Sequence, residues 1–78
     1  MFIKKLVQII GSKELSIKEI LEKAELKDRK SLMDVYIYPA VKGKYVRMLY
    51  PQSPRHPRQK YLLTVKGLAL YNELNKNK

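Results

Sequence analysis

Residues 26–46 read LKDRKSLMDVYIYPAVKGKYV, and this stretch decides the fold that the sequence predicts. Asp28 is a good helix N-cap, because its short carboxylate accepts hydrogen bonds from the free N–H groups of the first turn and suits the positive helix end. We therefore predict a helix over about residues 28–42. Its apolar side chains cover a broad arc that we expect to be buried, namely Leu32, Val35, Tyr36, Ile37, Ala40 and Val41.

The remaining polar side chains of this helix gather on one side, because successive residues turn by about 100°. They are Lys30, Ser31, Asp34 and Tyr38. A helix that is buried over most of its surface and keeps one narrow polar stripe suits a recognition helix, the helix that enters the major groove of DNA. An ordinary amphipathic helix with a solvated face fits the same stripe.

Pro39 lies inside the predicted helix. Proline lacks the N–H that an α-helix needs and disfavours helical geometry at the preceding Tyr38. The helix either ends near Tyr38, or kinks and continues to Lys42, where Gly43 ends it. We expect the second outcome, because the two residues after Pro39 are apolar and continue the buried arc.

Two further helices are predicted before this one. Residues 2–10, FIKKLVQII, carry an apolar stripe of helical period that includes Phe2 and stops at Gly11. Residues 16–24 begin with a capping box formed by Ser16 and Glu19. The alternating Lys and Glu on this second helix form a solvated face, to which we assign no function. A brief turn then leads to residue 28, as in a helix-turn-helix unit, although the usual glycine is missing.

Residues 44–50 are predicted to be a strand, because they are rich in β-branched and aromatic residues, and residues 59–63 are predicted to be its partner. The loop between them, PQSPRHPR, has three prolines, and we expect it to be extended and unable to pair with neighbouring strand edges. A hairpin with a basic loop after a helix-turn-helix is a wing, which lies along the DNA backbone or in the minor groove. A solvated loop is the alternative.

Thr64 is predicted to cap a last helix over residues 65–74, whose core face would carry Val65, Leu68, Ala69 and Leu74. Gly67 costs about 1 kcal/mol relative to alanine in a helix, so we expect it to allow a close approach of another element. The predicted fold is a single mainly α winged helix-turn-helix domain over residues 1–78, with three helices, a two-stranded wing and a C-terminal helix.

The charge of the chain indicates a polyanionic partner. Its 78 residues include 17 Lys and Arg against 7 Asp and Glu, a formal net charge of +10. Residues 27–60 hold nine of the basic residues against two acidic ones, so the excess falls on the predicted recognition helix and wing. The chain has no cysteine, no apolar run long enough to span a bilayer and no signal peptide, so we expect a cytoplasmic protein without membrane contact.

Double-stranded DNA is the predicted partner, contacted from two elements. On and beside the recognition helix the candidate residues are Lys27, Arg29, Lys30, Ser31, Asp34 and Tyr38. On the wing they are Arg47, Ser53, Arg55, His56, Arg58 and Lys60. Asp34 suits a cytosine amino group but is repelled by phosphates. Such proteins often dimerise to read two half-sites, so a homodimer is a further expectation.

The alternative is a protein-interaction module of the same fold, since architecture alone does not decide function. Tyr36, Tyr38, Tyr45 and Tyr50 would then form an interface to an acidic protein partner, and Asp34 in the polar stripe favours this reading slightly. We expect no enzyme activity, no cofactor and no metal. His56 is the single histidine, no carboxylate lies near it in the sequence, and the serines show no catalytic triad pattern.

Several motifs resemble a known family. They are residues 26–32 (LKDRKSL), Tyr36, Pro39-Ala40, Pro51, Pro54 and residues 59–67 (QKYLLTVKG). Over about residues 15–70 the chain resembles the C-terminal winged-helix segment of Fic-like proteins and of proteins related to the RecG helicase. The resemblance implies a winged helix with a DNA-binding role, often appended to another domain, and the chain is either such an accessory domain or a free-standing relative.

The departures from the family pattern also carry expectations. Asp34 and Val35 replace a basic and an amide position of the family's helix. The Fic catalytic motif, His-Pro-Phe followed by a glycine-rich anion loop, is absent, so we expect no AMP transfer. The glycines Gly11, Gly43 and Gly67 stand apart, so no helicase phosphate loop is present either.

Overall fold

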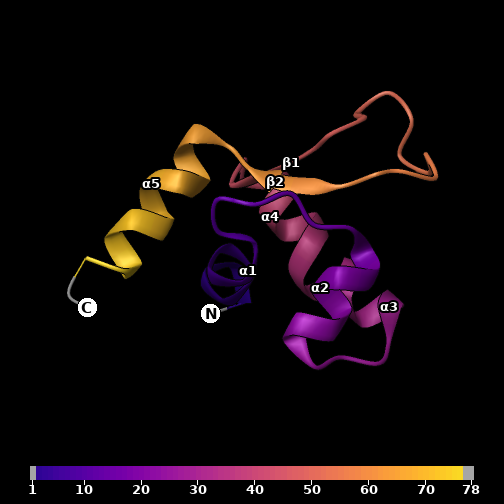
Figure 1. Cartoon of the computed structure of the whole chain (residues 1–78), viewed down its shortest axis with the longest axis horizontal. Coiled ribbons are helices and arrows are strands. Elements are labelled where there is room, and N and C mark those ends of the chain that lie inside the picture. The colour runs from indigo at the N-terminus through magenta and orange to yellow at the C-terminus, as the bar shows by residue number, and fades with distance from the viewer. Residues whose placement is uncertain (1, 77–78) are drawn as a thin grey trace.

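The computed structural model describes residues 2–76, and of Phe2 only the backbone, so its predicted place in the first apolar stripe lies outside the described side chains. The chain folds into helices and one antiparallel hairpin (Figure 1). In chain order the elements are α1 (Phe2–Ile10), α2 (Ile17–Ala24), α3 (Arg29–Ser31), η1 (Leu32–Ile37), α4 (Tyr38–Lys42), β1 (Val46–Met48), β2 (Tyr61–Leu63) and α5 (Val65–Leu74). The predicted mainly α winged helix-turn-helix architecture is confirmed.

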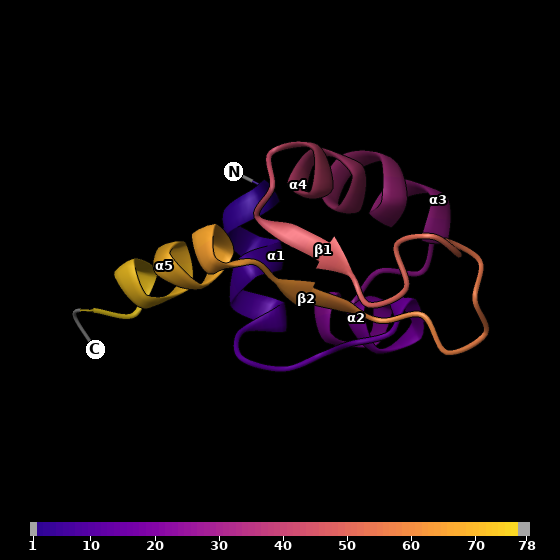
Figure 2. The ribbon, with the colours of Figure 1, turned by 90° about the horizontal axis from the view of Figure 1, so that it is seen from above.

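α1 lies at the centre and packs against α2, η1, β2 and α5 (Figures 1 and 2). The side chains that fill this core are apolar and almost fully buried. They are Leu6, Val7, Ile10, Leu15, Ile20, Leu32, Tyr36, Ile37, Ala40, Val46, Tyr61 and Leu63. Every helix and strand except α3 and α5 contributes to this list, so the core joins the helix-turn-helix unit to the hairpin.

Residues 29–42 are helical throughout, so the predicted continuation past Pro39 is confirmed. The route is a π-helical segment, η1, in which the Tyr38 N–H donates to the Met33 carbonyl five residues back. This wider turn directly precedes Pro39, which has no N–H to donate. The wider turn also changes which side chains of the helix point toward the core. Val35 is 38% exposed, so its predicted burial is wrong.

α2 is capped at its start as the sequence predicts, whereas the C-terminal ends of α2 and α4 show two features that were not predicted. Ser16 and Glu19 form the expected capping box at the start of α2. Glu25 takes the left-handed conformation after α2 (φ 58°), which replaces the glycine that the turn lacks. After α4, Lys44 rather than Gly43 is left-handed (φ 65°), and the Tyr45 N–H closes the helix on the Ala40 carbonyl at 2.9 Å.

The hairpin pairs Val46 with Leu63 and Met48 with Tyr61. Leu15 adds one bridge to Tyr61 on the other side of β2. The strands are shorter than the predicted 44–50 and 59–63, because the left-handed Lys44 belongs to the helix end and the loop begins to turn at residue 50.

α5 begins with the predicted Thr64 cap, whose hydroxyl oxygen accepts from the Gly67 N–H at 3.0 Å. The expected close approach at Gly67 is confirmed, since a Cβ there would lie 2.0 Å from the Tyr45 carbonyl oxygen. The predicted core face of α5 is wrong in three of four residues: Val65 (86% exposed), Leu68 (37%) and Ala69 are exposed. Because Gly67 must face the hairpin, the residues that share its side of the helix pack inward instead, namely Leu70, Tyr71 and Leu74.

Candidate nucleic-acid interface

The wing loop, residues 51–58, is folded into three consecutive turns, so its predicted extended form is wrong. Backbone hydrogen bonds join Ser53 N–H to the Tyr50 carbonyl (3.1 Å), His56 N–H to the Ser53 carbonyl (2.9 Å) and Gln59 N–H to the His56 carbonyl (3.0 Å). The three prolines of the loop, at positions 51, 54 and 57, each occupy the second position of one turn. There the fixed φ of proline favours the turn.

Gln59 ties the two ends of this loop together. Its side chain is nearly buried (9% exposed), and its Oε1 accepts from the Tyr50 N–H at 2.8 Å. Its Nε2 donates to the carbonyls of Tyr50 (2.8 Å) and Ser53 (3.1 Å). The side-chain amide of Gln59 thus takes part in three hydrogen bonds, which hold the loop in place. They also satisfy the polar atoms of this nearly buried side chain, as burial requires.

His56 has a structural part in the same loop. Its ring stacks on Tyr50 with 3.9 Å between the centroids and 12° between the planes. Its Nδ1 accepts from the Arg58 N–H at 2.9 Å. This hydrogen bond and the ring stack together hold the second half of the loop.

A groove of about 800 Å³ runs between the wing loop and the starts of α2 and α3. It is lined by Ser16, Ile17, Lys18, Arg29, Pro54, Arg55, His56, Pro57, Gln59 and Tyr61. Three of these side chains are cationic and none is a carboxylate. The groove is therefore basic, and it connects the wing to the helix-turn-helix unit.

Tyr61 marks the floor of this groove on the strand side. Burial raises the pKa of its phenol above 10.0, the Tyr38 phenol raises it further, and the Arg29 guanidinium opposes both effects. Side chains of α3 and α4 therefore both influence the pKa of the Tyr61 phenol. Tyr38 is 58% exposed, and Arg29 lines the groove together with Tyr61.

Asp28 caps α3 as the sequence predicts. Its carboxylate accepts from the Ser31 hydroxyl at 2.8 Å and from the Lys30 N–H at 3.0 Å. These two hydrogen bonds, with Ser31 first, hold the pKa of Asp28 below its ordinary value of 3.8. Ser31 therefore donates its hydroxyl proton within the protein, and its predicted contact to a base would use the hydroxyl oxygen as acceptor.

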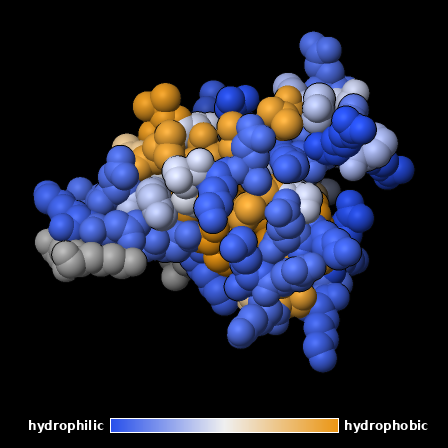
Figure 3. All heavy atoms as spheres, viewed as in Figure 1, coloured by the Kyte–Doolittle hydropathy of each residue, from blue (hydrophilic) through white to orange (hydrophobic). Residues whose placement is uncertain are grey.

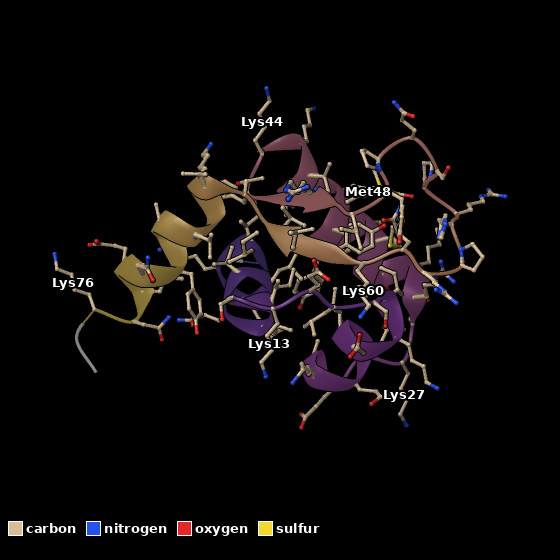
Figure 4. All side chains as sticks on the ribbon, turned by 45° about the horizontal axis from the view of Figure 1, so that its top comes forward. Lys13, Lys27, Lys44, Met48, Lys60 and Lys76 are labelled. Carbon is tan, nitrogen blue, oxygen red and sulfur yellow. The ribbon has the colours of Figure 1, made fainter. Side chains whose placement is uncertain are left out.

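The other predicted site residues do not line the groove. Lys27, Lys30 and Asp34 are exposed on the helix-turn-helix unit, and Arg47 is exposed on β1, between Val46 and Met48. Ser53 and Arg58 are exposed on the wing loop, whereas Lys60 is half-buried. Figure 4 shows Lys27 pointing away at the α2–α3 end, with Lys44 on the opposite side of the molecule. The structure thus brings Arg29, Arg55 and His56 into one groove and leaves Lys27 and Arg47 outside it.

Lys18, Gln59 and Tyr61 line the groove but were not predicted to be site residues. The spacing of the loop prolines, three residues apart, was a signal for successive turns. Nothing in the sequence near Lys18 distinguishes it from the other lysines of α2, since only the folded loop brings Arg55 to the same groove.

Among the described residues 2–76, no group of three His, Asp or Glu side chains lies together as metal ligands need to. No helix within that range combines the length and apolar character required to cross a bilayer. Of the four tyrosines proposed for a protein interface, Tyr36 is buried (7% exposed), which removes it from any surface.

A helix-turn-helix unit, an antiparallel hairpin and a folded basic loop beside the start of the helix over residues 29–42 define a small winged-helix domain. The chain belongs to the Fic-like C-terminal domain family. That family, described as "Filamentation induced by cAMP protein Fic-like, C-terminal domain", matches residues 2–64.

A solved structure supports this membership. The crystal structure of a Fic family protein from Desulfovibrio desulfuricans G20 is similar to this chain with a TM-score of 0.78 and 32% sequence identity. The similarity covers 83% of this chain but 20% of that one, so the chain spans about a fifth of the length of its relative. No curated protein matches the chain.

Proposed function

We propose that this domain binds double-stranded DNA, as a transcriptional regulator or as a module that targets a longer protein to DNA. The observation that carries the proposal is the basic groove: Arg29 from the recognition helix and Arg55 from the wing line one surface that contains no carboxylate. Phosphate neutralisation by such residues supplies much of the affinity of proteins for DNA. The formal net charge of +10 supports the same partner.

The roles of the residues follow from their places. The recognition helix, residues 29–42, would present Lys30, Asp34 and Tyr38 to base edges in the major groove, because these side chains are exposed on it. Arg29 and the wing arginines Arg55 and Arg58 would hold the sugar–phosphate backbone. Ser31 would meet a base edge as an acceptor, since its hydroxyl proton is donated to Asp28. Further backbone contacts are proposed for Lys27, Arg47, Ser53, His56 and Lys60.

The test is fluorescence anisotropy of a labelled duplex of random sequence, titrated with protein at several salt concentrations. We expect binding that weakens steeply with salt, with a slope that implies about four or more released counterions. The double variant Arg55→Ala, Arg58→Ala should flatten the slope by about one unit per lost phosphate contact. The control Lys13→Ala, Lys76→Ala removes the same charge away from wing and recognition helix and should lower the slope less (Figure 4).

An unchanged slope in the wing variant would show that the wing does not contact DNA. If the wild-type protein does not bind the duplex at low ionic strength, the proposed DNA-binding function is wrong. Co-purified nucleic acid, seen as absorbance skewed toward 260 nm, is a quick first indication.

We also propose that this chain carries no catalytic activity. The single histidine, His56, is used to hold the loop, through its stack on Tyr50 and its hydrogen bond from Arg58. A relation to RecG-helicase-related proteins and a cytoplasmic location stay predictions from the sequence.

A protein contact at the other end of the molecule is the second candidate. Val65 (86% exposed) and Leu68 (37%) present apolar side chains on the first turns of α5. Figure 3 shows this apolar surface as orange spheres over the start of α5. A homodimer would use this face, and Leu68→Lys would abolish that contact without changing the salt slope for DNA. Sedimentation of the free protein distinguishes the homodimer from a monomer.

A further inference from the structure

We infer that the groove between the wing loop and the starts of α2 and α3 is a phosphate-binding site, in which Lys18 acts together with Arg29 and Arg55. A phosphodiester of the DNA backbone is the ligand that the proposed function supplies, and to that extent the inference rests on it. A free phosphate compound shares the same chemistry, so the two sources are separated by experiment below.

Three separate elements supply the cations of this groove. Lys18 comes from the first turn of α2, Arg29 from the first turn of α3 and Arg55 from the wing loop. No carboxylate is among the lining residues. The groove volume of about 800 Å³ falls within the range of about 300–1,000 Å³ typical of ligand sites, so a sugar–phosphate unit fits with its solvent.

The two carboxylates nearest in sequence to the groove cations, Glu19 and Asp28, are hydrogen-bonded within their own helix caps. Glu19 accepts from the Ser16 N–H at 2.9 Å, as part of the capping box of α2. Asp28 accepts from Ser31 and Lys30 at the start of α3. These hydrogen bonds lower the pKa of both groups, and both carboxylates have their strongest partners within their own caps.

Arg55 is presented by a loop with internal hydrogen bonds. It lies between Pro54 and Pro57, inside turns that Gln59 holds by hydrogen bonds to Tyr50 and Ser53. A loop that is ordered before binding loses less conformational entropy when it binds. An arginine fork in a fixed place also suits the paired oxygens of a phosphate, whereas Lys18 adds a point charge.

The role of Lys18 is what distinguishes this site from an ordinary wing contact. Lys18 lies on the helix that precedes the recognition helix, and its neighbours Glu19 and Lys23 suggest a plain solvated face. We assign Lys18 a ligand because the start of α2 and the wing loop line the same groove. Lys23, on the same helix but outside the groove, provides a matched control.

The first experiment compares Lys18→Gln, Arg29→Gln, Arg55→Gln and Lys23→Gln by duplex anisotropy at several salt concentrations, after circular dichroism confirms the fold of each variant. Each groove variant should lower the salt slope by about one unit, and Lys23→Gln should leave it unchanged. Equal slopes in all four variants, with the wild-type protein still binding DNA, would overturn the groove and leave the proposed function intact.

The second experiment uses inorganic phosphate and follows the backbone amide resonances of ¹⁵N-labelled protein. We expect saturable shifts at residues 16–18, 29 and 54–59, and their loss in Arg55→Gln. If phosphate causes these shifts but the protein does not bind duplex, the groove binds phosphate and its ligand is a free phosphate compound rather than DNA. If neither duplex nor phosphate shifts these residues, the phosphate site and the DNA function both fail.

Discussion

The two ends of the hairpin are held by different forces. At the wing end, the side chain of Gln59 and the stack of His56 on Tyr50 fix the loop. At the α5 end, a glycine lets the helix touch the backbone of Tyr45, where a Cβ would lie 2.0 Å from the carbonyl oxygen. Polar groups organise the first contact and close packing organises the second.

This difference explains what each end exposes. A loop held by hydrogen bonds needs no apolar core of its own, so its remaining side chains are free to be basic, as Arg55 and Arg58 are. A helix that must turn its glycine inward has to turn other residues outward, which exposes Val65 and Leu68 (Figure 3). The wing end therefore suits a polyanion, and the α5 end suits an apolar contact.

The largest effect is expected from Gly67→Ala. Alanine is normally about 1 kcal/mol better than glycine in a helix. Here the added Cβ meets the Tyr45 backbone, so we expect a net loss of about 3 kcal/mol in the free energy of unfolding. Urea unfolding measures the change, with the exposed Ala69→Gly on the same helix as control. A more stable Gly67→Ala variant would show that α5 does not depend on this contact.

A smaller effect is expected from Gln59→Leu. The change leaves the Tyr50 N–H and the carbonyls of Tyr50 and Ser53 without their side-chain partner, at a cost of about 1–2 kcal/mol, since water reaches part of the loop. Hydrogen exchange at the Tyr50 amide should become faster while α5 stays protected. Gln52→Leu, an exposed change in the same loop, is the control. Unchanged exchange at Tyr50 would contradict the role given to Gln59.

Acid should weaken the helix starts at the wing end. The pKa of Glu19 lies below 4.5, first through its backbone hydrogen bond to Ser16, and that of Asp28 lies below 3.8, first through Ser31. Their contribution to stability is present above these ordinary values and is lost as pH falls below them. Urea unfolding between about pH 6 and pH 3 should therefore show a decline that Glu19→Gln with Asp28→Asn makes shallower. An unaltered decline would place its origin elsewhere.

The smallest effect on stability is expected from Val65→Lys. The side chain is 86% exposed, so we expect a change within about 0.5 kcal/mol in the free energy of unfolding. A loss comparable to that of Gly67→Ala would mean that the start of α5 is covered, for instance by a second copy of the chain. Sedimentation of both proteins would show this directly.

The elements that depend on neighbouring residues were predictable from the sequence. The capping box of α2, the Asp28 and Thr64 caps, the helix through Pro39 and the close approach at Gly67 all rest on local chemistry. The arrangement of these elements as a winged helix followed from their order.

The errors arose where distant residues decide the outcome. The face of α5 depends on where Gly67 meets Tyr45, and helical period alone does not reveal that contact. The wing loop was expected to be extended because proline removes N–H donors, but the same residue also fixes turns. Gln59 and Lys18 gained their places only from the folded loop, which their neighbours in sequence do not specify.

The most direct test of the account is a map of duplex binding by backbone amide resonances of the wild-type protein. We expect a short duplex to shift the resonances of residues 16–18, of the helix from Arg29 onward and of the wing loop, and to leave those of α5 unchanged. Shifts confined to α5, or no shifts at low ionic strength, would contradict the claim that the wing end is the nucleic-acid-binding end of this molecule.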